Sequence, residues 1–280
     1  RDRNRSMYTE YQPSHLLVPY IDSYWEFKGN PDYGMRIHIL PDGCTDFIFT
    51  LGEVANAVEE GSLIMQPYRS YFVGPMTKYS ELVTYTESIH MFGVRFLPCG
   101  LSCFTNLPLH EFVNSRVSTN EMKAVFDDTF IEKLGEQKHV TDRIRVVEEY
   151  LLAYLARHYQ PADSHVAMAV NMINHSKGKR SVRSLMDDVC LCQRHFERKF
   201  KHYTGFTPKE YSRIVKFKNA VELLRTTTSA NLLTTAVDAG YYDLAHFSKE
   251  IKSMSGNTPA SFLSLTVPEE TTLTYIEPQR

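Results

Sequence analysis

Two helical segments near the C-terminus carry side chains that could contact DNA. In the segment from about Gln193 to Tyr203, Phe196 and Phe200 are four residues apart and should face a core together. Arginine can donate two hydrogen bonds to guanine, glutamine can pair with adenine, glutamate can accept from cytosine, and lysine neutralises phosphate. A solvated helix face has a similar composition, and alone this segment favours that simpler interpretation. The outward residues are Gln193, Arg194, Glu197, Arg198 and Lys201.

An ungapped internal repeat reverses that preference. Such a repeat indicates a duplicated supersecondary unit, and duplication of a polar helix face is expected of a DNA-binding module. The offset is 51 residues, and the matching positions are His195-Phe196 with His246-Phe247, Lys201 with Lys252, Gly205–Pro208 with Gly256–Pro259, and Tyr211 with Phe262.

Each repeat is predicted to contain two helices joined by a tight turn. Turns of three or four residues, one of them with glycine, match a helix-turn-helix. The expected elements are a helix Ser181–Asp188, a turn at 189–191 and a helix from Gln193 to about Tyr203, then a helix Leu232–Ala239, a turn at Gly240 and a helix capped by Asp243 that runs to about Met254.

The second unit presents a less polar face. Phe247 and Ile251 are predicted to point inward. Small and apolar side chains can contact thymine methyl groups, and His246 can donate to a phosphate or a base. A histidine beside a phenylalanine is as commonly a packing residue, so both roles stay open for His246. The outward residues are Leu244, Ala245, His246, Ser248 and Lys249.

The elements that precede these units change type along the chain. Short segments rich in aromatic and β-branched residues predict an antiparallel barrel or sandwich, and they lie at 24–28, 36–40, 45–51, 81–85 and 90–96. After Pro98 the pattern becomes helical. A helix at 142–158 carries Ile144, Val147, Leu151 and Leu155 at helical spacing, and this stripe should pack on the barrel or on a second copy of the chain.

The N-terminal segment has more aromatic residues than a small barrel needs for packing, which favours a pocket for a small organic ligand. Arg36, His38, Asp46 and Arg95 would orient a polar or acidic ligand if they point inward, and would be a solvated face if they point outward. No His-x-His pattern is present, so we expect no metal and no cofactor.

Charge is distributed unevenly along the chain. Residues 163–267 contain 15 Lys and Arg against 9 Asp and Glu, a net of +6, whereas the rest of the chain carries a net of −8. This asymmetry indicates a basic module attached to an acidic one. We find no apolar run of about 20 residues and no signal peptide, and the five cysteines have no framework spacing; we therefore expect a cytoplasmic protein with free thiols.

Residues 165–265 resemble the DNA-binding domain of the AraC family of transcription regulators. The resemblance rests on Leu185, a recognition helix at Cys192–Tyr203, the Gly-x-x-Pro turn at 205–208, the Ala-x-x-x-Gly-aromatic pattern at 236–241 and the closing Gly-x-Thr-Pro at 256–259. It implies a long connecting helix from Tyr211 to Arg225. More weakly, Leu40–Asp46 and Phe92–Phe96 resemble segments of the cupin-like sensor domains that precede such modules.

Together these observations predict an α+β chain with a cupin-like antiparallel β-barrel and an all-α domain with two helix-turn-helix motifs. The expected parts are a sensor domain at 7–140, a connecting helix and linker at 141–163, the DNA-binding domain at 164–267 and a flexible tail at 268–280. We expect a non-enzymatic transcription regulator whose partners are double-stranded DNA, a small effector, a second copy through the helix 142–158, and RNA polymerase.

Two alternatives remain open from the sequence. One is a DNA-targeted enzyme or repair protein that uses a reactive thiol such as Cys44, although Asp42 and Asp46 nearby would raise the pKa of that thiol. The other is a ligand-binding or partner-binding protein whose helix-turn-helix units have lost DNA contact. The basic balance of residues 163–267 argues against this last alternative.

Overall fold

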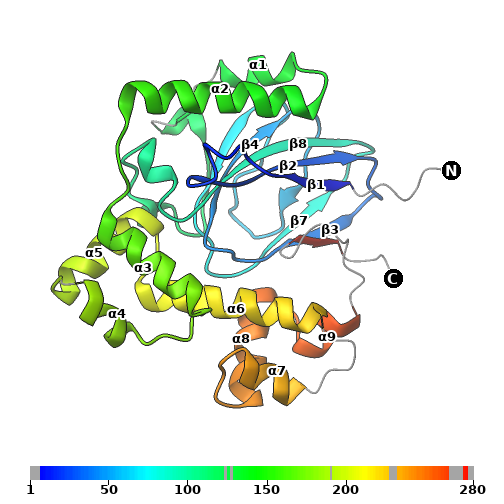
Figure 1. The fold of residues 1–280 in the computed structure, drawn as a ribbon. Helices are drawn as coiled ribbons and strands as arrows, with labels where there is room; N and C mark the ends of the chain where they lie inside the picture. Colours follow the sequence, from blue (N-terminus) through cyan, green and yellow to red (C-terminus); the bar gives the residue numbers. More distant parts are fainter. Residues whose placement is uncertain are drawn as a thin grey trace.

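The chain has a β-rich N-terminal part and a helical C-terminal part (Figure 1). The computed structural model describes residues 7–122, 125–126, 129–189, 191–226, 232–264 and 274–276. Figure 1 shows α1 (Phe130–Gly135) and α2 (Val140–His158) above the strands, with the remaining helices below them. Cys190, which belongs to the predicted turn at 189–191, and most of the predicted tail lie outside the described residues.

The larger sheet is antiparallel and is buried on both faces. Its strand order is β1-β2-β8-β4-β6-β9, and its strands are β1 Tyr8–Tyr11, β2 Ile21–Gly29, β8 Ile89–Phe96, β4 Thr45–Thr50, β6 Ser70–Val73 and β9 Arg116–Ser118. Gly93 of β8 lies opposite Trp25 of β2, and a Cβ on this glycine would meet the indole ring at 1.9 Å. Glycine is therefore required here so that the indole can lie against the backbone of β8.

A smaller sheet packs on one face of the larger one. Its order is β10-β3-β7-β5, with β10 Thr274–Ile276, β3 Met35–Ile39, β7 Ser80–Thr84 and β5 Asn56–Ala57. One hydrophobic cluster joins the two sheets and includes Trp25, Ile37, Ile48 and Leu82. The antiparallel class is thus confirmed, but the described strands form two facing sheets rather than a closed barrel.

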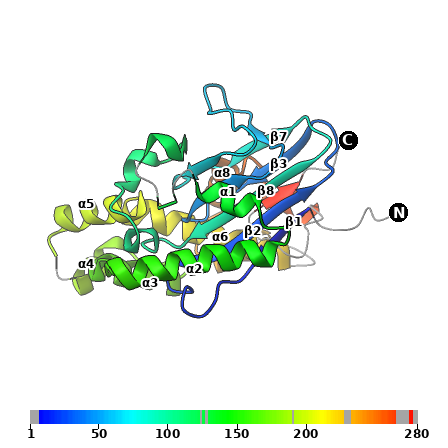
Figure 2. The same cartoon turned by 90° about the horizontal axis from the view of Figure 1, so that it is seen from above.

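The other face of the larger sheet packs on α2. Val147 and Leu151 are fully buried in a cluster with Phe47 and Phe92 from the strands. Figure 2 shows α2 running over β2 when the molecule is seen from above. The apolar stripe predicted at 142–158 is therefore used by the chain's own core. Of the two partners that the sequence left open for this stripe, the structure supplies the chain's own sheet.

Three short helical turns belong to the N-terminal part, and one of them lies against α5 (Gln193–Thr204) of the C-terminal part. They are the 3₁₀ turns η1 Leu101–Cys103, η2 Leu109–Phe112 and η3 Thr119–Glu121. η2 packs directly on a helix of the C-terminal part, α5. This turn therefore contributes to the contact between the two parts of the chain.

In the C-terminal part, the described residues form seven helices, with the long helix α6 at the centre. They are α3 Ser164–His175, α4 Val182–Val189, α5 Gln193–Thr204, α6 Pro208–Thr226, α7 Leu232–Asp238, α8 Leu244–Ser255 and α9 Pro259–Ser264. Their core also includes Leu40 and Cys99 from the N-terminal part. The two parts therefore share one packed interface. Within the described ranges, no helix combines the length and apolar character of a membrane span.

Three residues of the predicted flexible tail lie within the described part of the chain. Thr274–Ile276 forms β10, which pairs antiparallel with β3 at the edge of the smaller sheet. The polar composition of the tail favoured disorder, but an exposed sheet edge offers backbone partners that any sequence without proline can use. These three residues thus lie at the edge of the smaller sheet.

Candidate nucleic-acid interface and effector surfaces

Helix α5 presents the face that the sequence predicted. Phe196 and Phe200 are fully buried, which turns the opposite side outward. Gln193 Nε2 donates to Glu197 Oε1 at 2.9 Å, so these two side chains are already oriented along the helix. Contact of Gln193 with a base would require this bond to be exchanged or extended. On the outer side, Gln193, Arg194, Arg198 and Lys201 are exposed and Glu197 is half-buried.

Helix α8 is built in the same way with a less charged surface. The Asp243 carboxylate accepts from the backbone N–H of His246 at 2.7 Å and so caps the helix. Phe247 and Ile251 are fully buried. Glu250, on the same helix, pairs with Arg213 of α6 at 2.8 Å, which neutralises an acidic charge near this surface. Of the predicted contacts, Leu244, Ala245, His246 and Lys249 are exposed and Ser248 is half-buried.

The two units repeat at the level of individual hydrogen bonds. α5 and α8 end at Gly205 and Gly256, whose φ angles are +83° and +75°. Thr204 Oγ1 donates to the carbonyl four residues earlier at 2.7 Å and accepts from the N–H two residues later at 3.2 Å. Ser255 Oγ makes the same two bonds at 2.6 and 3.1 Å. The 51-residue offset therefore corresponds to a duplicated structure.

A basic cleft lies between the two units, where the sequence gave no reason to expect one. Its volume is about 640 Å³, and Glu250 and His246 also line it. Lys216 lies with Nζ 5.4 Å above the ring centroid of Tyr241, and burial lowers the pKa of this lysine. Three of the basic residues lie on one face of α6, and the other two come from the segment between α3 and α4, so the cleft depends on a tertiary contact that sequence analysis did not identify. The basic residues are Lys179, Arg180, Lys209, Arg213 and Lys216.

Asp46 and Arg95, two of the four predicted ligand contacts, lie side by side between the sheets. They are opposite each other on β4 and β8, and Arg95 Nε is 3.2 Å from Asp46 Oδ1. Arg95 also pairs with Glu10 at 3.2 Å and with Asp42 at 3.4 Å. Desolvation, opposed by Arg95, raises the pKa of Asp46 to about 6. One guanidinium is thus shared by three carboxylates and is already satisfied.

Arg36 and His38 lie elsewhere. Both are on β3, where Ile37 points into the core between the sheets and its neighbours therefore point to the outer face. Arg36 is hydrogen-bonded to Glu81 on β7, and His38 is buried and stacks on Tyr79 with ring centroids 6.0 Å apart. The four predicted residues therefore do not form one site. The sequence could not show this, because alternation along a strand defines two faces without showing which of them points inward.

One loop of the N-terminal part contacts both recognition helices. We call residues 74–79, between β6 and β7, the coupling loop. At Gly205 a Cβ would meet Pro75 Cγ at 2.5 Å, and at Gly256 a Cβ would meet Tyr79 Cζ at 2.6 Å. The coupling loop therefore lies against the C-terminal caps of α5 and α8 at positions that are equivalent in the repeat.

Further contacts fix the two parts together. Lys218 Nζ donates to the Asp42 carbonyl at 3.2 Å, and His202 Nε2 lies 3.0 Å from Asn106 Oδ1. At Gly43 a Cβ would meet the Tyr211 ring at 2.7 Å. A shift of these N-terminal loops would therefore change their contacts with α5 and α6.

The thiol proposed for the enzymatic alternative is poorly placed for reaction. Cys44 is buried, and burial together with Asp42 raises the pKa of its thiol well above the usual range. A nucleophilic cysteine needs the thiolate. Among the described residues, no three His, Cys, Asp or Glu side chains gather into a possible metal site.

Comparisons with known proteins divide the chain in the same two parts. Residues 9–118 match a domain of unknown function, DUF6597, and residues 185–264 match a family described as a helix-turn-helix domain. No curated protein sequence matches the chain.

Among solved structures, ToxT from Vibrio cholerae is 10% identical, with a TM-score of 0.52 over 88% of this chain and 100% of ToxT. ToxT with an unsaturated fatty acid bound gives 10% identity and a TM-score of 0.47 over 87% and 96% of the two chains. A probable AraC family regulator from Rhodopseudomonas palustris gives 20% identity and a TM-score of 0.33 over 36% and 96%. Residues 185–264 of this chain therefore match a helix-turn-helix domain family, in a chain whose two-part fold is similar to that of ToxT.

Proposed function

We propose that the chain is a sequence-specific transcription regulator whose α5 and α8 enter two successive major-groove segments on one face of DNA. The observation that carries this proposal is the duplicated unit, with identical helix caps, on the two ends of α6. Helix-turn-helix units that read neighbouring groove segments lie about 34 Å apart along the duplex. A rigid central helix supports a fixed spacing of this kind.

The charge of the surface supports the same proposal. Arg194 and Arg198 are exposed on α5 and are candidates for base contacts, whereas the basic cleft between the units is a candidate for the phosphates that separate the two groove segments. On this proposal α5 supplies most of the sequence preference. The less polar α8 adds thymine contacts and a smaller electrostatic contribution.

We further propose that a small molecule bound in the N-terminal part changes DNA affinity. The contacts of the coupling loop with both recognition helices support this, because a ligand that favours one position of the loop would favour one arrangement of the helices. The chain would act without catalysis and in the compartment that holds its DNA. Contact with RNA polymerase remains a prediction.

Dimerisation through residues 142–158 also remains a prediction. The apolar residues of α2 pack on the larger sheet, so a second copy would meet the outer side of the helix, where Arg145, Glu149 and Ala153 are exposed. Such a polar surface favours a small and salt-sensitive interface over a hydrophobic one.

The test of DNA recognition is a selection of bound sequences from random DNA, followed by affinity measurements on the selected site. Arg194→Ala and Arg198→Ala should each cost ~1–3 kcal/mol if the side chain contacts a base. Arg69→Ala makes the same change at an exposed position just before β6 and serves as the matched control. Unchanged affinity in both α5 variants would remove this helix from the interface.

A further inference from the structure

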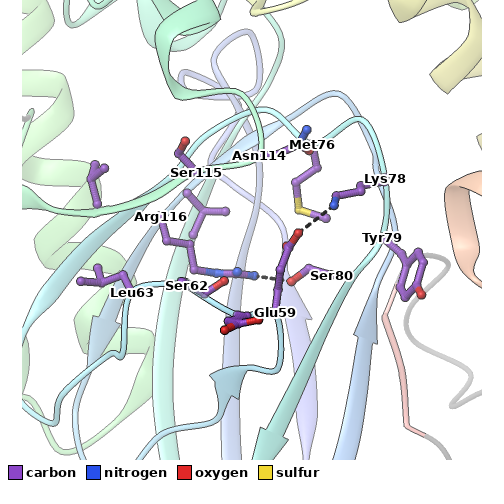
Figure 3. A pocket seen from close by; sticks show the side chains of 14 residues that line it. Glu59, Ser62, Leu63, Met76, Lys78, Tyr79, Ser80, Asn114, Ser115 and Arg116 are labelled. Carbon is purple, nitrogen blue, oxygen red and sulfur yellow. Dashed lines mark hydrogen bonds and ion pairs between the residues drawn. The ribbon is translucent and has the colours of Figure 1, made fainter.

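An open pocket lies at one end of the two facing sheets, beside the coupling loop. Its volume is about 400 Å³, and it is bounded by residues 59–63, the coupling loop and β9. Figure 3 shows the Arg116 side chain crossing this pocket from β9 toward Ser80 and Glu59. Sequence analysis did not single out Arg116, because nothing near it in the sequence indicates a site.

Within the described part of the chain, the half-buried guanidinium of Arg116 has no carboxylate at ion-pair distance. Its Nη2 donates to Ser80 Oγ at 2.8 Å, but its Nε is buried and has no hydrogen-bond partner among the described residues. Burial lowers the pKa of this guanidinium. Glu59 is the acid with the largest electrostatic effect on Arg116, but its carboxylate is paired with Lys78 at 2.8 Å. Leaving a charged donor unpaired in this way is costly unless something else binds it.

Arg95 in the same part of the chain provides the contrast. It is more deeply buried than the half-buried Arg116, and it has Glu10, Asp42 and Asp46 as ion-pair partners. Among the described residues, three carboxylates lie within ion-pair distance of Arg95 and none lies within that distance of Arg116. The unsatisfied one, Arg116, is the one that lies in an open pocket.

The surroundings of Arg116 also define the rest of a ligand. Arg116, Val73 and Met76 line the open pocket on one side and a narrow apolar cavity between the sheets on the other. That cavity has a volume of about 50 Å³, with Trp25 and Ile37 among its walls. One water molecule needs about 10–15 Å³ of such a cavity volume, so this cavity has room for an apolar group several times that size but not for a long acyl chain.

We propose that Arg116 anchors the effector site, and that this site takes a small organic carboxylate with a short apolar side chain. The carboxylate would accept hydrogen bonds from the guanidinium, which is suited to such acceptors, and the apolar group would enter the cavity between the sheets. A long acyl chain exceeds that cavity. This inference rests on the proposed function, because it identifies the ligand of that regulator.

The position of the pocket explains how occupancy would reach the DNA. Met76, Lys78 and Tyr79 of the coupling loop line the pocket, and Tyr79 also lies against the cap of α8. Asn114 lines it too and holds the loop through two hydrogen bonds with Thr77, at 2.8 and 2.9 Å. A carboxylate on Arg116 would change the charge balance beside Lys78 and bias the position of this loop.

The test is calorimetric titration of the full chain with acetate, isovalerate, phenylacetate and palmitoleate, and with isovaleramide as the uncharged counterpart of isovalerate. We expect isovalerate or phenylacetate to bind more tightly than acetate and palmitoleate, and isovaleramide not to bind. Arg116→Gln should raise the dissociation constant of the bound acid by about tenfold or more, since hydrogen bonds between charged groups are strong. Arg36→Gln, on the outer face of the smaller sheet, should bind as the unaltered chain does.

Several outcomes would overturn the site. These are equal binding by Arg116→Gln, tighter binding of palmitoleate than of the short acids, binding of isovaleramide as tight as that of isovalerate, or no binding by any of the acids. Thermal unfolding of each variant shows that it is folded, and Arg116→Lys provides a second, charge-conserving change that should bind more weakly than arginine. DNA affinity is measured separately, so that DNA binding without carboxylate binding refutes the site, and the reverse refutes the regulator.

Discussion

Substitution of the two helix-cap glycines tests whether the coupling loop really supports the recognition helices. Gly205 and Gly256 both have positive φ angles, and alanine in this region costs ~1–2 kcal/mol from backbone strain alone. Gly61 has a φ of +79° with nothing within 4 Å of an added Cβ, so Gly61→Ala measures the strain without a contact. The difference between the cap variants and this control isolates the contact with the loop.

The expected losses differ because the two contacting groups differ. At Gly205 the new Cβ would lie 2.5 Å from the rigid Pro75 ring and 3.2 Å from the Leu109 carbonyl, and overpacking of this kind costs a further ~1–3 kcal/mol. At Gly256 it would meet the Tyr79 ring, which can rotate away at a smaller cost. Gly205→Ala should therefore lose the most stability, Gly256→Ala less, and Gly61→Ala the least.

Two measurements are made on each variant. Urea unfolding followed by far-ultraviolet circular dichroism gives its stability, and a separate titration gives its DNA affinity. We expect the order of stability just given, and we expect both cap variants to weaken DNA binding. Equal losses for Gly205→Ala and Gly61→Ala would refute the contact between Pro75 and the cap of α5, and with it the route from the pocket to that helix.

Three further changes test other parts of the structure. The pKa of Asp46 is raised to about 6 in the folded state, so its contribution to stability is present at low pH and is lost as pH rises from about 4 through about 6. Asp46→Asn should therefore flatten the pH dependence of the free energy of unfolding, measured with urea across that range. An unchanged pH profile would contradict this expectation. Lys209→Ala should weaken binding to all DNA sequences alike and reduce the salt slope by about 1, whereas a sequence-dependent effect would place it at a base. Leu151→Ala should cost ~2–5 kcal/mol of unfolding free energy because the side chain is fully buried, and a loss limited to oligomerisation would instead favour a dimer contact.

The features that the sequence predicted well are those with a local signal. The repeat located both helix-turn-helix units, and the structure shows why it persisted: Thr204 and Ser255 make the same cap bonds before Gly205 and Gly256. The aromatic segments of the N-terminal part were placed on strands because aromatic and β-branched residues suit a buried sheet.

The features that were missed depend on pairing between distant segments. Asp46 meets Arg95 because β4 and β8 are in one register, and Arg36 faces outward because β3 forms part of a second sheet. Arg116 reaches Ser80 across 36 residues of sequence. Alternation along a strand defines two faces but does not say which is buried, so the predicted four-residue site could not be assembled from sequence alone.

The central claim is that two helix-turn-helix units on one central helix read DNA together. Hydroxyl-radical footprinting of the full chain on its selected site tests this most directly. The account predicts two protected segments on one face of the duplex, about one helical turn apart, with Arg194→Ala weakening protection of only one of them. A single protected segment, or protection without any sequence preference in the selection, would contradict it.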